Sequence, residues 1–263
     1  MSRLEVQAIL RALPSFDGFV SVARLQRLAE TIAAGPSPCR VAVAGESAEG
    51  RPIHHVVAGA GPVKALLVGG PHCNEPIGSM TVSGLLSLLH EGLPALLQAG
   101  VEWHVIPCID PDGARLNEAW TQGPFDLERY MRGYYLQAPA RQVDTSFPLT
   151  HRGVVVERPS PEAQVLLGVL QRVLPDFYFP LHNAWTGGAF FHLSHDLGPG
   201  AYTRIARLLA DEDMPLQTRP IWSEICAQYA PGFVEIFRIT RYYDHLARGG
   251  ADLAAGPAFG AGS

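Results

Sequence analysis

Long apolar runs are missing from this 263-residue sequence. No stretch approaches the ~20 apolar residues that a membrane-spanning helix needs, and Met1–Ser15 lacks the apolar core of a secretory signal peptide. Basic clusters are also absent, and a formal charge of −5 with a pI near 6.0 argues against a nucleic-acid-binding surface. We therefore expect a soluble, cytoplasmic protein with neither a membrane nor a nucleic-acid partner. The oligomeric state is left open.

Closely spaced cysteines and internal repeats are missing too. The four cysteines are far apart and none belongs to a Cys-x-x-Cys motif, so in a reducing compartment we expect free thiols. With 47% apolar residues the chain can bury one large core. We expect a single domain over residues 1–248, followed by a disordered Gly/Ala-rich tail at 249–263.

The order of apolar segments predicts alternating strands and helices. Helical spacing predicts a helix over 21–34, and the continuous apolar run 63–68 is typical of a strand covered on both faces. Further helices are expected over 79–92 with Ser79 as N-cap, over 159–174 with Ser160 as N-cap and Pro161 first, and over 201–210, with a last short helix or turn near 241–248. Further strands are expected over 41–43, 53–57, 101–109, 176–183 and 233–239. Residues 111–160 are expected to be irregular. This pattern predicts an α/β fold with a mostly parallel or mixed central sheet flanked by helices.

Polar side chains follow two of these strands. His72 and Glu75 come after the strand at 63–68, and His182 and Asn183 end the strand at 176–183. Ligands gather beyond the carboxyl ends of parallel strands, so the two turns can meet. Two histidines and one glutamate are a common ligand set of catalytic zinc. His-x-x-Glu alone is a weak signal, and the alternative is that the pair caps the following helix.

Five motifs, in order, resemble the zinc carboxypeptidase family, the funnelin-type metallopeptidases. They are GESAEGRPI (45–53), GGPHCNE (69–75), DPDG (110–113), PLHN (180–183) and FVEIF (233–237), and the resemblance covers about residues 20–240. The second motif has the Asn before Glu of bacterial members and of related aspartoacylase-type and succinylglutamate desuccinylase-type deacylases.

The resemblance implies a role for each matched residue. His72, Glu75 and His182 would hold one Zn²⁺ ion, and Glu235 would be the general base for hydrolysis of an amide bond by metal-activated water. Because burying an unpaired charge is costly, a carboxylate among apolar strand residues indicates a role other than packing. The alternatives are that Glu235 is a solvent-facing edge charge and that Glu224 is the base.

The sequence departs from the family at the site that clamps a substrate's terminal carboxylate. The family has an Asn-Arg pair between an Asp and a Phe-Pro, but this chain reads QVDTSFPLT (142–150). Asp144 is kept, whereas Thr145 and Ser146 cannot form a bidentate clamp. Two alternatives follow: Arg115 or Arg132 replaces the missing arginine in binding substrate, together with Asn183 and Asp144, or the substrate has no free α-carboxylate there.

Three functions therefore stay open at this stage. The first is a cytoplasmic metallopeptidase acting on a small peptide, and the second is a deacylase acting on an N-acyl amino acid. The third is a non-catalytic protein that keeps the fold and binds metal or ligand. His192 and His195 form a second His-x-x-His, which we interpret as surface or pocket-wall histidines.

Overall fold

The computed structural model describes residues 3–183, 187–218, 224–236, 238–250 and 253. The chain divides into two compact units, one of Met1–Pro148 and Val156–Asn183, the other of Leu149–Val155 and Ala184–Ser263. Each unit is described by itself below. That residues 1–248 form one domain stays a prediction. The tail expected to be disordered, 249–263, lies almost entirely outside the described residues.

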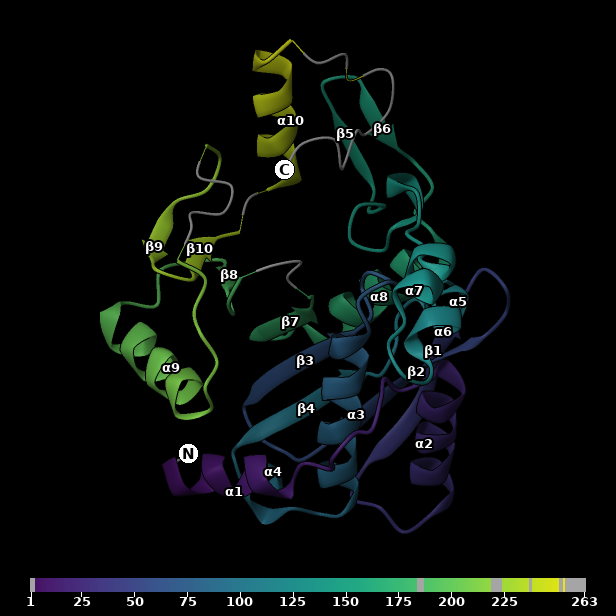
Figure 1. Cartoon of the computed structure of the whole chain (residues 1–263), viewed down its shortest axis with the longest axis vertical. Coiled ribbons are helices and arrows are strands. Elements are labelled where there is room, and N and C mark those ends of the chain that lie inside the picture. The colour runs from purple at the N-terminus through teal and green to yellow at the C-terminus, as the bar shows by residue number, and fades with distance from the viewer. Residues whose placement is uncertain (1–2, 184–186, 219–223, 237, 251–252, 254–263) are drawn as a thin grey trace. The chain divides into compact units, whose positions relative to one another are not determined.

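A mixed five-stranded sheet forms the centre of the first unit (Figure 1). Its order is β1-β2-β4-β3-β7, in which β1–β2 and β2–β4 are antiparallel while β4–β3 and β3–β7 are parallel. The strands are β1 (Arg40–Glu46), β2 (Pro52–Ala58), β3 (Val63–Gly69), β4 (Val101–Ile106) and β7 (Phe177–Leu181). The expected fold class, a mixed sheet flanked by helices, is confirmed.

Both faces of this sheet are covered by helices because its strands alternate apolar side chains to both sides. Val56 and Ala58 of β2 pack with α2 (Val22–Ala34) and α3 (Pro76–His90). Ile53 of the same strand points to the other side, where α8 (Pro161–Val173) packs. Each fully buried aliphatic side chain contributes about 1.5–3 kcal/mol. Two apolar layers therefore fix the sheet and the turns at its carboxyl edge.

The helix starts follow local capping chemistry. As predicted, the Ser160 hydroxyl accepts the backbone N–H of Ala163, and α8 begins at Pro161. The predicted N-cap Ser79 is wrong, because α3 begins three residues earlier, at Pro76. Proline is well suited to the first helical position, since it has no N–H to satisfy there. Glu75 becomes the N-cap residue, and its side chain makes no capping hydrogen bond, so its carboxylate can bond elsewhere.

The segment expected to be irregular contains short elements. Between 111 and 160, each is too brief for apolar periodicity to show, and local caps define them instead, as where Asp110 accepts the N–H of Gly113. These elements are α5 (Pro111–Leu116), α6 (Glu118–Thr121), α7 (Leu127–Gly133), the 3₁₀ turn η1 (Pro139–Arg141), β5 (Leu149–His151) and β6 (Val154–Val156). Two further helices, α1 (Arg3–Ala12) and α4 (Pro94–Leu97), belong to the first unit, whereas β5 and all of β6 except Val156 belong to the second.

The second unit has a three-stranded sheet whose centre is Phe233. The Phe233 ring stacks on Phe191 at 5.1 Å and contacts Tyr202 at 4.7 Å between ring centroids. The predicted strand 233–239 is shorter than expected, because pairing ends at Glu235. The elements are β8 (Phe191–Leu193), α9 (Pro199–Asp211), β9 (Gln228–Ala230), β10 (Phe233–Glu235) and α10 (Ile239–Arg248). Among helices of the described residues, none has the length and apolar character needed to cross a bilayer.

Buried carboxylates hold the turn between β1 and β2. Asp112 accepts the hydroxyl of Ser47 and the N–H of Glu49, both at 2.8 Å. Glu162 accepts the N–H of Ala48 at 2.8 Å. The Gly-Arg-Pro turn is therefore tied to the DPDG turn and to the start of α8, so these motifs serve the architecture of the first unit.

A third carboxylate, Asp110, is 2% exposed. Burial raises its pKa to about 6 from 3.8, with nearby Glu162 and Asp112 adding to the effect. Because the folded-state pKa is raised, Asp110 favours folding most below pH ~4, and this contribution is lost as pH rises through about 6. We expect Asp110→Asn to raise the free energy of unfolding at pH 7.5 by on the order of 1–3 kcal/mol, and by less near pH 4. Urea unfolding at both pH values measures this.

The matched control for that measurement is Asp126→Asn. Asp126 also caps a helix, accepting the N–H of Arg129, but it does so on the surface. The free energy of unfolding that Asp110→Asn gains should differ between the two pH values and exceed the gain of the control. Equal gains in either comparison would contradict a buried charge as the cause.

Candidate metal centre

The carboxyl ends of β3 and β7 bring the two polar turns together. The strands are parallel neighbours in register, with Gly69 opposite Leu181. The turn that follows each strand therefore leaves the sheet at the same edge. Gly78 allows the start of α3 to approach this edge, because a Cβ there would lie 2.4 Å from the carbonyl oxygen of Leu181.

Glu75 lies between the two predicted histidine ligands. Its Oε1 is 2.9 Å from Nδ1 of His72, and its Oε2 is 2.9 Å from Nδ1 of His182. Oε2 also accepts the backbone N–H of Asn183 at 3.0 Å. The carboxylate is buried, with Glu75 6% exposed. The three residues predicted as ligands thus converge, with both imidazoles turned to one carboxylate.

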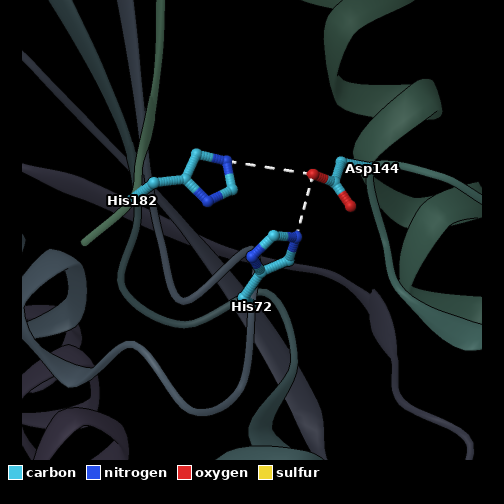
Figure 2. Close-up of side chains that lie close together, drawn as sticks. All are labelled: His72, Asp144 and His182. Carbon is cyan, nitrogen blue, oxygen red and sulfur yellow. Dashed lines mark ion pairs between the residues drawn. The ribbon is translucent and has the colours of Figure 1, made fainter. Parts of the chain in front are cut away.

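Asp144 contacts the opposite edges of the same imidazoles. Its Oδ2 lies 3.1 Å from Nε2 of His72 and 3.9 Å from Nε2 of His182, as the dashed lines of Figure 2 show. The two rings lie 4.6 Å apart between centroids, at 65°. Each histidine therefore faces Glu75 with one nitrogen and Asp144 with the other.

The paired carboxylates make this a place that stabilises positive charge. Burial disfavours the charged forms of His72 and Glu75, but their mutual hydrogen bonds outweigh it. Hydrogen bonds from both histidines lower the pKa of Glu75 to about 2. Hydrogen bonds to Asp144 and Glu75 raise the pKa of His72 to about 10. Glu75 is therefore ionised at neutral pH, whereas His72 holds a proton that it would have to release to bind a metal.

The donor set fits a zinc ion. Two imidazole nitrogens and a buried carboxylate match in kind the three-ligand sets of zinc hydrolases, and each Glu75 oxygen lies 2.9 Å from one Nδ1. A second placement uses the Nε2 atoms with Asp144, since one ligand atom from each of His72, Asp144 and His182 lies within 4.8 Å of the others. Among the described residues, neither His192 nor His195 belongs to a group of three such ligand atoms.

The predicted substrate-binding arginines are on the surface of the first unit. Arg132 pairs with Glu128 at 2.8 Å, and its side chain is 79% exposed. Arg115 is exposed near the end of α5. Within the described residues, neither arginine has a hydrogen bond or ion pair with the side chains that surround the two histidines. Asn183 adjoins them, and its buried Oδ1 has no hydrogen-bond partner. The substrate-binding roles stay predictions.

The candidate bases Glu235 and Glu224 belong to the second unit. Glu235 accepts the N–H of Ala227 at 3.2 Å and pairs with Arg241 at 2.8 Å. These two contacts hold the pKa of Glu235 below its usual range. Glu224, by contrast, is an exposed partner of His245 at 3.2 Å. The choice of Glu235 stays a prediction.

Sequence reasoning missed one buried residue beneath the centre. Asn117 is 1% exposed and donates to the carbonyl oxygen of Cys73, which lies between His72 and Glu75 in the chain. Its position at the junction of two short helices has no apolar periodicity to mark it. The only local signal is an asparagine one turn beyond the DPDG motif, and that signal is weak.

Comparisons with known proteins agree with this geometry. The sequence model of the family described as "Zinc carboxypeptidase" matches residues 25–135, which include His72 and Glu75. No curated protein gives a significant match.

Three similar solved structures, two of them carboxypeptidases by name, have low identity to this chain. Bovine thrombin-activatable fibrinolysis inhibitor, in complex with tick carboxypeptidase inhibitor, is 14% identical with TM-score 0.52, covering 74% of this chain and 70% of that one. A putative carboxypeptidase A from Shewanella denitrificans is 15% identical with TM-score 0.50, and the match covers 83% of this chain and 61% of that one. A putative carboxypeptidase from Burkholderia mallei is 19% identical with TM-score 0.44, and the match covers 71% of this chain and 46% of that one.

The chain spans less than two thirds of the length of both bacterial proteins. At these identities the structural matches speak for the fold alone. The family match speaks for the segment that carries the first two ligands. The resemblance seen in the sequence is thus confirmed where it is tested: residues 25–135 match the zinc carboxypeptidase family model, and the mixed sheet flanked by helices is the fold of these similar structures.

Proposed function

We propose that this protein is a zinc-dependent hydrolase that cleaves an amide bond in a small peptide or peptide-like metabolite. The observation that supports this most is the placement of Glu75, whose two oxygens each lie 2.9 Å from Nδ1 of a histidine. The family match covers His72 and Glu75. His182 completes the set from the neighbouring parallel strand.

One zinc ion would be held by Nδ1 of His72, Nδ1 of His182 and the Glu75 carboxylate. Bound zinc polarises a carbonyl group and lowers the pKa of water. Asp144 would then accept the Nε2 proton of His72, fixing the tautomer that leaves Nδ1 free for metal. We favour this over Asp144 as a ligand, because Glu75 is buried and meets both rings at 2.9 Å, whereas Asp144 is 3.9 Å from His182.

Glu235 is the proposed general base. Its ionised carboxylate would take a proton from water and pass it to the departing amine. Arg241 and the N–H of Ala227 hold the carboxylate in place on β10.

Two proposals differ in how the protein binds the end of the substrate next to the cleaved amide. The residues in place of the family's Asn-Arg pair are engaged within the fold: Ser146 is 0% exposed, and the Thr145 hydroxyl donates to the carbonyl of Pro139. The second candidate is a deacylase of N-acyl amino acids or other small metabolites, and the loss of the clamp favours those substrates that have no free α-carboxylate at that point. For a carboxypeptidase, Arg115 or Arg132 would bind the free carboxylate, with Asn183 beside the metal. A cytoplasmic location likewise stays a proposal.

The test is metal analysis of the purified protein combined with hydrolysis of matched substrates. We expect about one zinc per chain, and amide cleavage that a chelator abolishes and added zinc restores. N-acyl dipeptides with free and amidated carboxyl ends are compared with N-acyl amino acids. A preference for a free carboxyl end that Arg115→Ala or Arg132→Ala removes supports the carboxypeptidase, and cleavage of N-acyl substrates that does not depend on a free carboxyl end supports the deacylase.

Two results would count against the enzyme. One is a zinc-loaded protein that cleaves neither substrate class, with ligand binding unchanged in Glu235→Gln, which would indicate a binding protein of the same fold. The other is the absence of any bound zinc after dialysis against the metal.

A further inference from the structure

We propose that Asn117 is a positioning residue that sets the spacing of the metal ligands. It does so by joining the ligand turn to residues 134–144, which we name the strap. The inference rests on the proposed zinc site, and it extends to a residue that contacts neither the metal nor the substrate.

The Asn117 amide binds the ligand turn and the strap at once. Its Nδ2 lies 3.1 Å from the carbonyl oxygen of Cys73 and 2.9 Å from that of Tyr135. Nδ2 also contacts the Gly113 carbonyl at 3.1 Å. Its Oδ1 accepts the N–H of Tyr135 at 3.0 Å and the indole N–H of Trp120 at 2.7 Å. Both ends of the amide are therefore satisfied, and Tyr135 is held through its N–H and its carbonyl.

The strap has further attachments on either side of this clamp. The amide of Asn74, next to Glu75, donates to the hydroxyl of Tyr134 at 3.1 Å. Gln137 donates to Asp110 at 2.5 Å. Gln142 then donates back to the carbonyl of Gln137 at 2.9 Å. The strap is thus attached through Tyr134, Tyr135 and Gln137, and braced internally by Gln142, before it reaches Asp144, which contacts His72.

This arrangement couples Asn117 to both carboxylates of the site. Cys73 lies between His72 and Glu75, so a shift of its carbonyl changes the spacing of those two ligands. The strap delivers Asp144 to Nε2 of His72 on the other side. When the Asn117 amide is removed, the backbone groups of Cys73 and Tyr135 that it binds are left unsatisfied, and this favours rearrangement of the turn. Because ligand orientation controls metal affinity, the effect should appear in zinc binding as well as in stability.

The experiment compares zinc affinity of the full chain with that of Asn117→Ser, using a chromophoric chelator as competitor, at a temperature where the metal-free variant is folded. We expect affinity to fall about 10- to 100-fold, as for other residues that orient metal ligands. With Co²⁺ in place of zinc, we expect the visible absorption band to change in position or intensity. The spectrum reports ligand geometry directly, which a loss of stability alone would not alter.

The matched control is Gln122→Ser. The Gln122 amide donates to the carbonyl of Phe19 and is also half-buried near α6, but it touches neither the ligand turn nor the strap. Its zinc affinity and cobalt spectrum should equal those of the wild type. Trp120→Phe is a milder variant that removes one donor to Asn117 Oδ1. It should weaken zinc binding about 2- to 10-fold, in the direction expected for impaired positioning.

The proposal is overturned if Asn117→Ser binds zinc as the wild type does and shows the same cobalt spectrum. If Asn117→Ser does not fold, Trp120→Phe decides, and wild-type affinity with a wild-type spectrum overturns the proposal. A wild type that binds neither metal instead removes the zinc site itself, and with it the proposed function.

Discussion

Replacing His182 with alanine is expected to leave the purified protein with less than about a tenth of the wild-type zinc. In the proposed ligand set His182 is one of three ligands and the only one that follows β7, so its loss would open the set between the two turns. With an apparent binding free energy shared among so few ligands, each accounts for roughly a 100- to 1000-fold change in affinity. Hydrolysis should fall in parallel with bound zinc. Elemental analysis after dialysis and competition with a chelator measure both quantities.

Asp144→Asn separates the two placements of the ion in the same assay. If Asp144 orients His72 from outside, zinc affinity should drop only about 10- to 100-fold, and the zinc content at saturation should stay near one. If Asp144 is itself a ligand, its variant should lose as much zinc as His182→Ala, and Glu75→Gln should lose little. Full zinc content in His182→Ala would contradict both placements.

Glu235→Gln is expected to abolish turnover while zinc stays bound. Glutamine keeps the size and hydrogen-bonding oxygen that Arg241 and Ala227 contact, but it cannot accept a proton. General acid–base catalysis contributes typically 100- to 10,000-fold, so kcat should fall by about that factor, with little change in KM. Steady-state hydrolysis with a parallel zinc determination is the measurement.

Glu224→Gln is the control for that experiment. It is the same substitution in the same unit, at an exposed carboxylate that pairs with His245. Its kcat should stay within about twofold of the wild type. The assignment would have to be exchanged if Glu224→Gln were the inactive variant and Glu235→Gln the active one.

Strong local signals were the part of the fold most open to prediction. Ser160 followed by Pro161 specifies a helix start through two neighbouring residues, and α8 begins where expected. At the start of α3 two local signals competed, and Pro76 prevailed over Ser79 because it occurs earlier and needs no N–H partner. The helices of four to seven residues between 111 and 133 are too short for periodicity to reveal.

The candidate site shows the same division. His72, Glu75 and His182 could be chosen because motif order indicated the family, and the register of β3 with β7 explains why they meet. Asp144 was expected near substrate, and its contact with Nε2 of His72 depends on how the strap crosses the turn. Asn117 depends wholly on partners distant in sequence. Such contacts are properties of packing, which no local pattern contains.

The approach of α3 to β7 at Gly78 has a consequence for how this centre can evolve. Even a methyl group there would wedge the helix away from Leu181. Glu75 lies just before that helix and His182 just after Leu181, so main-chain proximity, more than the ligating side chains, determines the gap between them. We therefore expect substitutions of Gly78 to disturb this centre, although glycine itself has no side chain that could bind a metal.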